Sequence, residues 1–222
     1  MAKRVKTFNE HESIVNSCSI GRRGPNLLAS GSDDGTIKIW DTRQRQSVHT
    51  FNSRFPVTSV AFSDDATSIF SGGIDNEIHQ WELSSERHIR SLQGHSDMIT
   101  GLSLSPTGNF LLSNSMDQSL RQWDVRPYVK DEHNRCSMVY TGHQHNFEKL
   151  LLKCAWSSDG ERVAAGSSDQ IAYVWRTDTG KIEYALPGHD GTITEIAFHP
   201  TEPVIVSCAT DRQIFLGELS HL

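Results

Sequence analysis

The chain has 222 residues, a formal net charge of -6, 36% hydrophobic residues and 22% charged residues. This hydrophobic fraction is enough for a folded core, and no Gly-X-Y period or sustained heptad indicates collagen or a coiled coil. The negative charge argues against a protein that holds nucleic acid mainly through its phosphates, and no run of 18 apolar residues predicts a membrane span.

Short β-strands are predicted along the whole chain, because β-branched and aromatic residues alternate with polar ones between turns rich in Gly, Asp, Asn and Ser. The first such segment is residues 4–8, which we expect to be the outer strand of another unit. Around the middle of the chain, four strands are expected at 99–105, 110–115, 120–123 and 136–140. The last unit predicts only three strands, and no window has helical spacing.

A repeat organises these strands. Five segments align on an aspartate, and the steps between the aspartates are 41, 42, 52 and 42 residues. The aspartates are Asp34, Asp75, Asp117, Asp169 and Asp211. The residues six positions later are Trp40, Trp81, Trp123, Trp175 and Gly217. Periods of about 40 residues with four strands per unit are typical of propeller blades.

Gly-His pairs near the start of several units and Trp-Asp pairs at 40–41 and 123–124 resemble the WD-repeat (WD40) β-propeller family over the full length of the chain. The resemblance implies an all-β propeller in one domain, residues 1–222, with five four-stranded blades. We expect the repeats at about 9–51, 52–92, 93–141, 142–186 and 187–222.

Closure of the ring is open at this point. Seven blades are usual in the family, so the resemblance implies five blades of an incomplete seven-bladed ring, with two N-terminal repeats missing from this sequence. The alternative is a closed five-bladed ring in which the strand at residues 4–8 completes the last blade.

The resemblance also implies buried polar sets. In the family, the histidine of Gly-His bonds the turn aspartate and a Ser or Thr two residues before it, and that hydroxyl reaches the indole N–H. Transferred to this chain, two sets are complete: His11, Ser32, Asp34, Trp40 and His95, Ser115, Asp117, Trp123. A third set is Ser167, Asp169 and Trp175, with either His143 or His145. Blades two and five lack parts of the set and are expected to hold their turns by Asp alone.

Protein binding is the function that this architecture favours, because it displays loop ends on a rigid ring. The candidate contacts lie beside the turn aspartates and in the loops that enter the blades on the same face. They are Asp33, Arg54, Asn76, Asp97, Met98, Met116, Gln118, Phe147, Gln170 and Arg212. Exposed Met, Phe and Arg side chains suit a contact surface. Each of these residues has the alternative interpretation of a solvated turn residue.

Other chemistries find little support in the sequence. His, Ser and Asp recur at structural positions without a strand–GxSxG–helix motif, so no catalytic residue, cofactor or enzyme activity is expected. His143 and His145, with His133 and Cys136 upstream, lack zinc-finger spacing, so no metal site is expected. Four scattered cysteines predict reduced thiols, and the basic pair Arg22-Arg23 is too small to predict RNA binding.

Several strings, which extend beyond the blade signature into turns and insertions, resemble one branch of the family, the WD-repeat subunits of the spliceosomal U5 small nuclear ribonucleoprotein. These strings are residues 21–41, 71–78, 101–127, 145–169 and 186–207. The resemblance implies a nuclear, non-enzymatic scaffold in pre-mRNA splicing that contacts spliceosomal proteins, including the large central U5 protein. It implies no direct RNA contact, membrane or small-molecule substrate. The alternative is a WD-repeat adaptor of another complex, a ubiquitin-ligase substrate receptor or signalling scaffold, in the cytoplasm.

Overall fold

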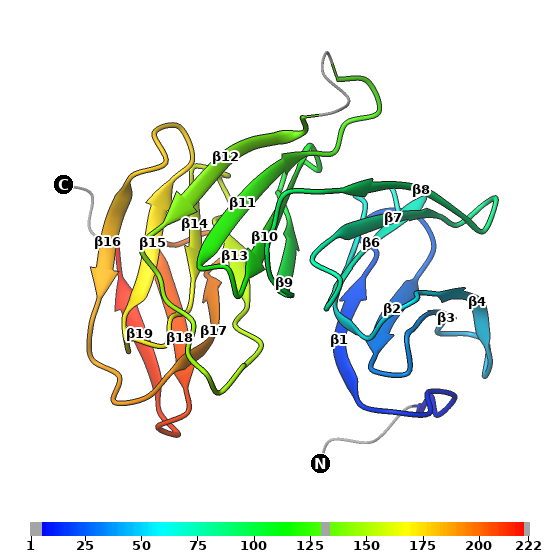
Figure 1. The fold of residues 1–222 in the computed structure, drawn as a ribbon, viewed down its shortest axis with the longest axis horizontal. Helices are drawn as coiled ribbons and strands as arrows, with labels where there is room; N and C mark the ends of the chain where they lie inside the picture. Colours follow the sequence, from blue (N-terminus) through cyan, green and yellow to red (C-terminus); the bar gives the residue numbers. More distant parts are fainter. Residues whose placement is uncertain (1–5, 130–133, 220–222) are drawn as a thin grey trace.

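The computed structural model describes residues 6–129 and 134–219, in which the chain forms 19 β-strands and no helix (Figure 1). The all-β prediction is therefore confirmed. Within these residues, no helix is long and apolar enough to cross a membrane. The strands form five antiparallel sheets, here called blades one to five, and within each sheet every strand pairs with the next one in the chain.

The strands and their bounds follow the repeat. Blade one contains β1 (Val15–Ile20), β2 (Leu27–Ser32), β3 (Thr36–Asp41) and β4 (Ser47–Asn52). Blade two contains β5 (Val57–Phe62), β6 (Ser68–Gly73), β7 (Ile78–Glu82) and β8 (Arg87–Leu92). Blade three contains β9 (Ile99–Leu104), β10 (Phe110–Ser115), β11 (Ser119–Asp124) and β12 (Cys136–Thr141). Blade four contains β13 (Cys154–Trp156), β14 (Arg162–Ala165), β15 (Ala172–Arg176) and β16 (Ile182–Leu186). Blade five contains β17 (Ile193–Phe198), β18 (Val204–Ala209) and β19 (Ile214–Glu218).

The prediction of five four-stranded blades is wrong for blade five, whose described residues form three strands. The segment expected to complete it lies elsewhere: residues 4 and 5 fall outside the described part, and residues 6–8 form no strand. Instead, the Lys6 ammonium donates to the Thr42 carbonyl at 2.8 Å, and the Phe8 ring lies 4.8 Å from the Trp40 ring. Because Phe8 packs on blade one, the closed five-bladed alternative is contradicted.

The blades follow one another along an open arc. The first strands of consecutive blades, β1, β5, β9, β13 and β17, contact each other and line its inner side. No contact of comparable extent joins blade one to blade five in the described residues, and Figure 1 shows these two blades at opposite sides of the molecule. The sheets therefore do not close into a ring.

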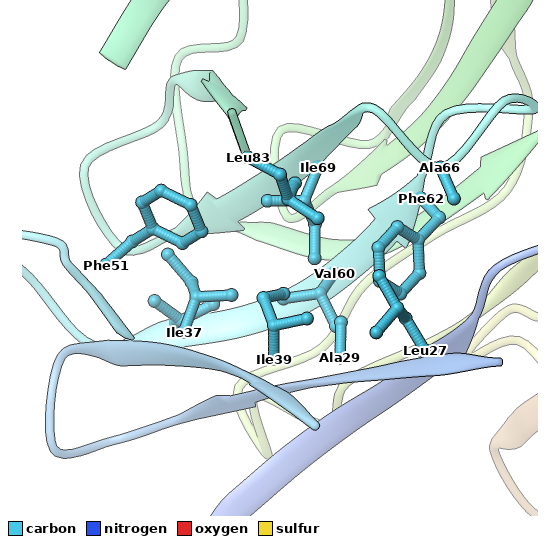
Figure 2. Packing of buried hydrophobic residues seen from close by; sticks show 11 residues of the cluster. Leu27, Ala29, Ile37, Ile39, Phe51, Val60, Phe62, Ala66, Ile69 and Leu83 are labelled. Carbon is cyan, nitrogen blue, oxygen red and sulfur yellow. The ribbon is translucent and has the colours of Figure 1, made fainter. Parts of the chain in front are cut away.

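The hydrophobic core lies between the blades. Figure 2 shows one layer, in which Ile37 and Ile39 of blade one face Val60 and Ile69 of blade two. The two sheets approach so closely that a Cβ on Gly31 would lie 2.6 Å from Cγ1 of Val57. Each blade thus buries an apolar face that it could not bury alone, as in other repeat proteins.

Equivalent positions are exposed at the two ends of the arc. Ile37 and Ile39 are fully buried against blade two, whereas their equivalents in blade five, Ile214 and Leu216, are 73% and 76% exposed. At the other end, Val15 and Ile20 of β1 are 50% and 67% exposed. Their blade-two equivalents, Val57 and Phe62, are only 1% and 3% exposed, because blade one covers them.

Two basic side chains brace the inner side of the arc. Arg22 of blade one donates to the carbonyls of Leu104 and Ser105 in blade three, at 2.7 and 2.6 Å. The Lys153 ammonium, next to β13, donates to the carbonyls of Thr58 and Thr100 at 3.4 and 3.1 Å. These contacts connect residues of four blades.

Candidate interaction face

The turns between the second and third strands share one backbone geometry. In each turn the residue after the aspartate is left-handed, with φ between 64° and 77°: Gly35, Asn76, Gln118, Gln170 and Arg212. Four of the aspartates accept the N–H of the residue two positions on, at 2.8–3.1 Å. An Asp side chain closes a turn in this way, and the left-handed residue then projects from its apex.

Each of four turns is joined to the loop that enters its own blade. The backbone N–H of Asp33 donates to Ile14, and that of Met116 donates to Met98, at 2.9 and 3.0 Å. Corresponding bonds occur in blades four and five, from residues 168 and 210. Turns and entering loops therefore form one surface, which we call the loop face: the turns around the five aspartates, and the loops at 9–14, 53–56, 93–98, 142–152 and 187–192.

A buried polar chain supports the loop face in blade three. The His95 imidazole donates from Nδ1 to the Asp117 carboxylate at 2.8 Å, and its Nε2 accepts from the Ser113 hydroxyl at 2.6 Å. The same serine oxygen accepts from the Trp123 indole N–H at 2.8 Å. The imidazole, hydroxyl and indole groups in this series of hydrogen bonds all have partners, which removes the cost of burying them. Blade one repeats the arrangement with His11, Asp34, Ser30 and Trp40.

The bridging serine is four residues before the aspartate, so the expectation of Ser32 and Ser115 in this role is wrong. The indole can reach Ser30 because Leu28 is the register partner of Trp40, and Ser30 is the next residue on the same side of β2. The Ser115 hydroxyl instead donates to the Asp97 carbonyl at 2.8 Å and accepts the Asp117 N–H at 3.2 Å. Ser32 likewise accepts the N–H of Asp34.

Blade four has no such set, although a third one was expected there. Its position for the bridging serine is Ala165, and the Trp175 indole donates to the Thr141 carbonyl at 3.0 Å. The aspartate, Asp169, accepts from the Tyr173 hydroxyl at 2.7 Å and from no histidine among the described residues. Ser167 accepts the Gln144 N–H. Neither candidate histidine docks as expected, because blade four supplies no hydroxyl for its imidazole.

Blades two and five also differ from the expectation that Asp alone holds their turns. In blade five, His189 bonds Asp211 at 2.8 Å and Ser207 at 2.9 Å. In blade two, the Trp81 indole donates to Ser71 at 2.8 Å. The imidazole of that blade comes from β7: His79 donates from Nε2 to Asp75 at 2.6 Å. The sequence signal for the serines was their recurrence four residues before the aspartate in four of the five repeats.

The polar sets hold their aspartates ionised. Burial alone would raise the pKa of Asp117, but hydrogen bonds from His95, the Ser119 hydroxyl and the Ser96 N–H outweigh it. The pKa of Asp117 therefore lies well below its usual range. For Asp34, burial is likewise outweighed by hydrogen bonds, first from the Thr36 hydroxyl, and its pKa also lies well below the usual range. Charged, hydrogen-bonded carboxylates make these turns stable at neutral pH.

The two histidines of blade four lie in a different environment, where His143 is buried and His145 is half-buried. Burial lowers the pKa of both His143 and His145 to about 4, and repulsion from His145 adds to the effect on His143. Nε2 of His143 donates to the Asn114 side-chain oxygen at 2.8 Å, whereas Nδ1 of His143 and Nε2 of His145 have no partner among the described residues. No cluster of metal ligands occurs in the described residues, and His133 lies outside them.

The structure places all ten contact candidates on the loop face. Seven are exposed: Asp33, Arg54, Asp97, Gln118, Phe147, Gln170 and Arg212. Three are half-buried: Asn76, Met98 and Met116. Two of the ten candidates, Asn76 and Gln170, support neighbouring loops, because their side chains donate to the carbonyls of Ser96 and Asp190. Sequence reasoning missed Phe55 and Ile74, which are 40% and 45% exposed beside named candidates.

The recurring Ser–His–Asp sets are shielded from any substrate. Ser113 is fully buried, and its oxygen is engaged by both an imidazole and an indole. The inner side of the arc holds a cavity of about 520 Å³, lined by Cys18, Lys153 and Glu195 and by further residues of β1, β5 and β9. None of the described histidines lines this cavity. The geometry therefore assigns the recurring polar sets to holding turns in place.

Comparison with known proteins agrees with this architecture. The family model described as "WD domain, G-beta repeat" matches residues 2–41, 45–82, 86–124, 134–176 and 180–216. The chain is 49% identical over 217 residues to the U5 small nuclear ribonucleoprotein 40 kDa protein of Homo sapiens, and 49% over 216 residues to the Dictyostelium discoideum protein of that name. It is 41% identical over 218 residues to the pre-mRNA-splicing factor cwf17 of Schizosaccharomyces pombe.

These matches cover 97–98% of this chain but only 60–63% of each relative. The chain thus spans less than two thirds of the length of the curated relatives it matches. Because the family model matches most of the residues, in five units, the chain belongs to the WD40 repeat family.

Proposed function

We propose that this WD40 chain acts in the nucleus as a scaffold in pre-mRNA splicing, as part of the U5 small nuclear ribonucleoprotein. The observation that carries the proposal is the 49% identity over 98% of the chain to the U5 40 kDa protein. Identity at this level over nearly the whole chain extends beyond the residues that the blade signature requires. The loop face gives the scaffold a surface on which other proteins can dock.

We infer that the chain is not an enzyme. The residues that resemble a catalytic triad, such as Ser113, His95 and Asp117, are consumed by hydrogen bonds within the blade. A nucleophile needs access to substrate, and the fully buried serine offers none. The exposed residues of the loop face are chemically mixed, which suits protein contacts better than one reaction.

The proposed partners are spliceosomal proteins, among them the large central protein of the U5 particle. Phe147 is 92% exposed on the loop entering blade four, and Arg54 and Arg212 are exposed on the same face. Aromatic and arginine side chains contribute most to protein interfaces. Direct RNA contact is not proposed, because Arg22 bonds blade-three carbonyls and Arg23 pairs with Asp64 at 3.2 Å.

The test is recovery of partners from nuclear extract. The chain, carrying an affinity tag, is expressed in cells, and the proteins purified with it are quantified by mass spectrometry against a tag-only control. We expect the U5 particle proteins to be enriched together. Enrichment of ubiquitin-ligase or signalling subunits instead, with no U5 protein above the control, would contradict the proposal and favour an adaptor of another complex.

A further inference from the structure

A recess on the loop face marks the one blade whose entering loop supplies no histidine. It has a volume of about 540 Å³ and lies between the loop at 52–55 and the outer strands of blade two. We call it the blade-two recess; the residues that matter here are Arg54, Phe55, Asp75, Glu77, Trp81 and His88.

The recess lies where the entering loop of blade two lacks the histidine found in blades one and three; the imidazole that bonds the turn aspartate here, His79, comes from β7. In blades one and three, His11 and His95 lie edge-on to Trp40 and Trp123, with ring centroids 6.1 and 5.9 Å apart. Those indoles are only 4% and 2% exposed. The corresponding loop of blade two carries Arg54 and Phe55, which are both exposed.

The tryptophan of blade two therefore keeps an accessible ring. Trp81 is half-buried, and its N–H is already satisfied by Ser71. Its ring contacts are with His88, Phe51 and His79, whose centroids lie 5.1, 5.7 and 6.0 Å away. What the indole offers a ligand is its electron-rich face, which attracts cations.

Two carboxylates give the recess a negative side. One oxygen of Glu77 accepts from Gln93 at 2.7 Å, and one oxygen of Asp75 accepts from His79 at 2.6 Å. In the described residues the second oxygen of each carboxylate has no hydrogen-bond partner. Burial, and then repulsion from His79, lowers the pKa of His88, so that imidazole is neutral at physiological pH and does not cancel the acids.

We propose that the blade-two recess binds the guanidinium of an arginine side chain presented by a protein partner, an inference that rests on the proposed role as a protein scaffold. A planar guanidinium can lie against the indole while its N–H groups donate to carboxylate oxygens. A lysine ammonium shares the charge but lacks the plane and the forked donors. An anion would meet two carboxylates.

The exposed Arg54 gives the proposal a sharp internal test. It lies at the rim of the recess and carries the same charge as the proposed ligand. If the recess takes a cation, Arg54 opposes binding, and its removal strengthens the interaction. If the recess takes an anion, Arg54 is the attracting group, and its removal weakens binding.

The experiment uses the full chain, labelled with ¹⁵N at its tryptophan indoles, and a capped Gly-Arg-Gly tripeptide. The matched peptide replaces arginine by citrulline, which keeps the shape and loses the charge. We expect a saturable shift of the Trp81 indole N–H signal with the arginine peptide, and less than a quarter of that shift with citrulline. Equal shifts with citrulline, or equal binding of a Gly-Lys-Gly peptide, would overturn the guanidinium assignment.

Variants sharpen the result. Glu77→Gln should weaken binding of the arginine peptide by about threefold, and Arg54→Ala should strengthen it by about twofold, as expected for partly screened single charges. Glu148→Gln, an exposed carboxylate in the loop entering blade four, should leave it unchanged. A Gly-phosphoserine-Gly peptide that shifts Trp81 more than the arginine peptide, together with weaker binding by Arg54→Ala, would reverse the assigned sign.

Failure of this inference is distinguishable from failure of the proposed function. If no arginine-dependent shift is seen but U5 proteins are still recovered from nuclear extract, the recess assignment falls and the scaffold role stands. If the peptide binds as expected but no U5 protein is recovered, the recess is a cation site in a protein of another complex.

Discussion

Blades three and four reach the same turn geometry with different chemistry. In blade three, a buried chain from Trp123 through Ser113 and His95 to Asp117 supports the turn. In blade four, the indole bonds a backbone carbonyl, and a tyrosine hydroxyl reaches the aspartate. Both turns nevertheless place a left-handed glutamine at the apex, with φ of 64° and 72°.

This difference teaches that the turn depends on the aspartate, while the rest of the set is exchangeable. Each buried polar atom needs a hydrogen-bond partner. In blade four, Ala165 stands at the position of the bridging serine, so the blade has one buried polar atom fewer to satisfy. Among the residues that the structure describes, blade four is left with unpartnered imidazole nitrogens, and blade three is not. The two blades should therefore respond differently to the same perturbation.

The largest expected effect comes from removing the turn aspartates. Asp117→Ala leaves the His95 imidazole, the Ser119 hydroxyl and two N–H groups without their acceptor, so we expect it to lower the free energy of unfolding by about 3 kcal/mol. Asp169→Ala should cost about 1 kcal/mol, because its tyrosine partner can turn to water. Chemical denaturation of both variants measures this, and equal losses would contradict the comparison.

Acid should act on blade four before it acts on blade three. The pKa values of His143 and His145 are about 4 in the folded chain against about 6.5 when unfolded, so the unfolded state binds more protons between these values. Stability is complete above pH 6.5 and falls as the pH drops toward 4, because the unfolded state takes up the protons that the folded imidazoles refuse. The turn aspartates, whose pKa values are lowered, add their loss only below about pH 4.

The control for this pH effect is His145→Gln, which removes one titrating group. Its free energy of unfolding should change less between pH 7 and pH 4.5 than that of the wild type. Urea unfolding at a series of pH values gives both slopes. An unchanged slope would mean that the buried histidines do not titrate as the structure implies.

Serine substitutions test the corrected register of the polar chain. Ser113→Ala removes the oxygen shared by an imidazole and an indole, and we expect a loss of about 1.5 kcal/mol. Ser115→Ala removes bonds to backbone groups only, and should cost about 0.5 kcal/mol. The reverse order of the two losses in thermal or urea unfolding would restore the original expectation for Ser115.

Exposed residues of the loop face should affect stability least. Phe147→Ala removes a ring that is 92% exposed, so its free energy of unfolding should stay within about 0.5 kcal/mol of the wild type. Thermal unfolding monitored by circular dichroism checks this. A larger loss would show that the ring packs inside the protein and is not available to a partner.

Much of this architecture could be predicted from sequence, because a pattern repeated every 41 or 42 residues predicts the same strands and turns in each unit. The strands of blade three were placed within a residue of their observed bounds, and the loop face was named by its turns. The three strands of the last unit were predicted, but the course of residues 6–8 was missed, since it depends on the contact of Phe8 with Trp40. The number of blades in a full ring stays a prediction.

The polar sets were harder to predict, because spacing along a strand does not say which side chain reaches across to its neighbour. Ser32 and Ser30 lie on the same side of β2, and only the pairing of Leu28 with Trp40 decides between them. In blade two, where Asp alone was expected to hold the turn, His79 on β7 bonds the aspartate in place of an entering-loop histidine. Such exchanges preserve the hydrogen bonds while changing their sequence positions.

The central claim is that buried polar sets hold the loop face in place while its exposed side chains bind other proteins. The most direct measurement combines Phe147→Ala with Arg212→Ala and compares U5 protein recovery from nuclear extract with the melting temperature of the purified variant. We predict an unchanged melting temperature and recovery reduced at least fivefold, whereas Glu148→Gln changes neither. Full recovery by the stable double variant would contradict the claim, because binding would then lie away from the loop face.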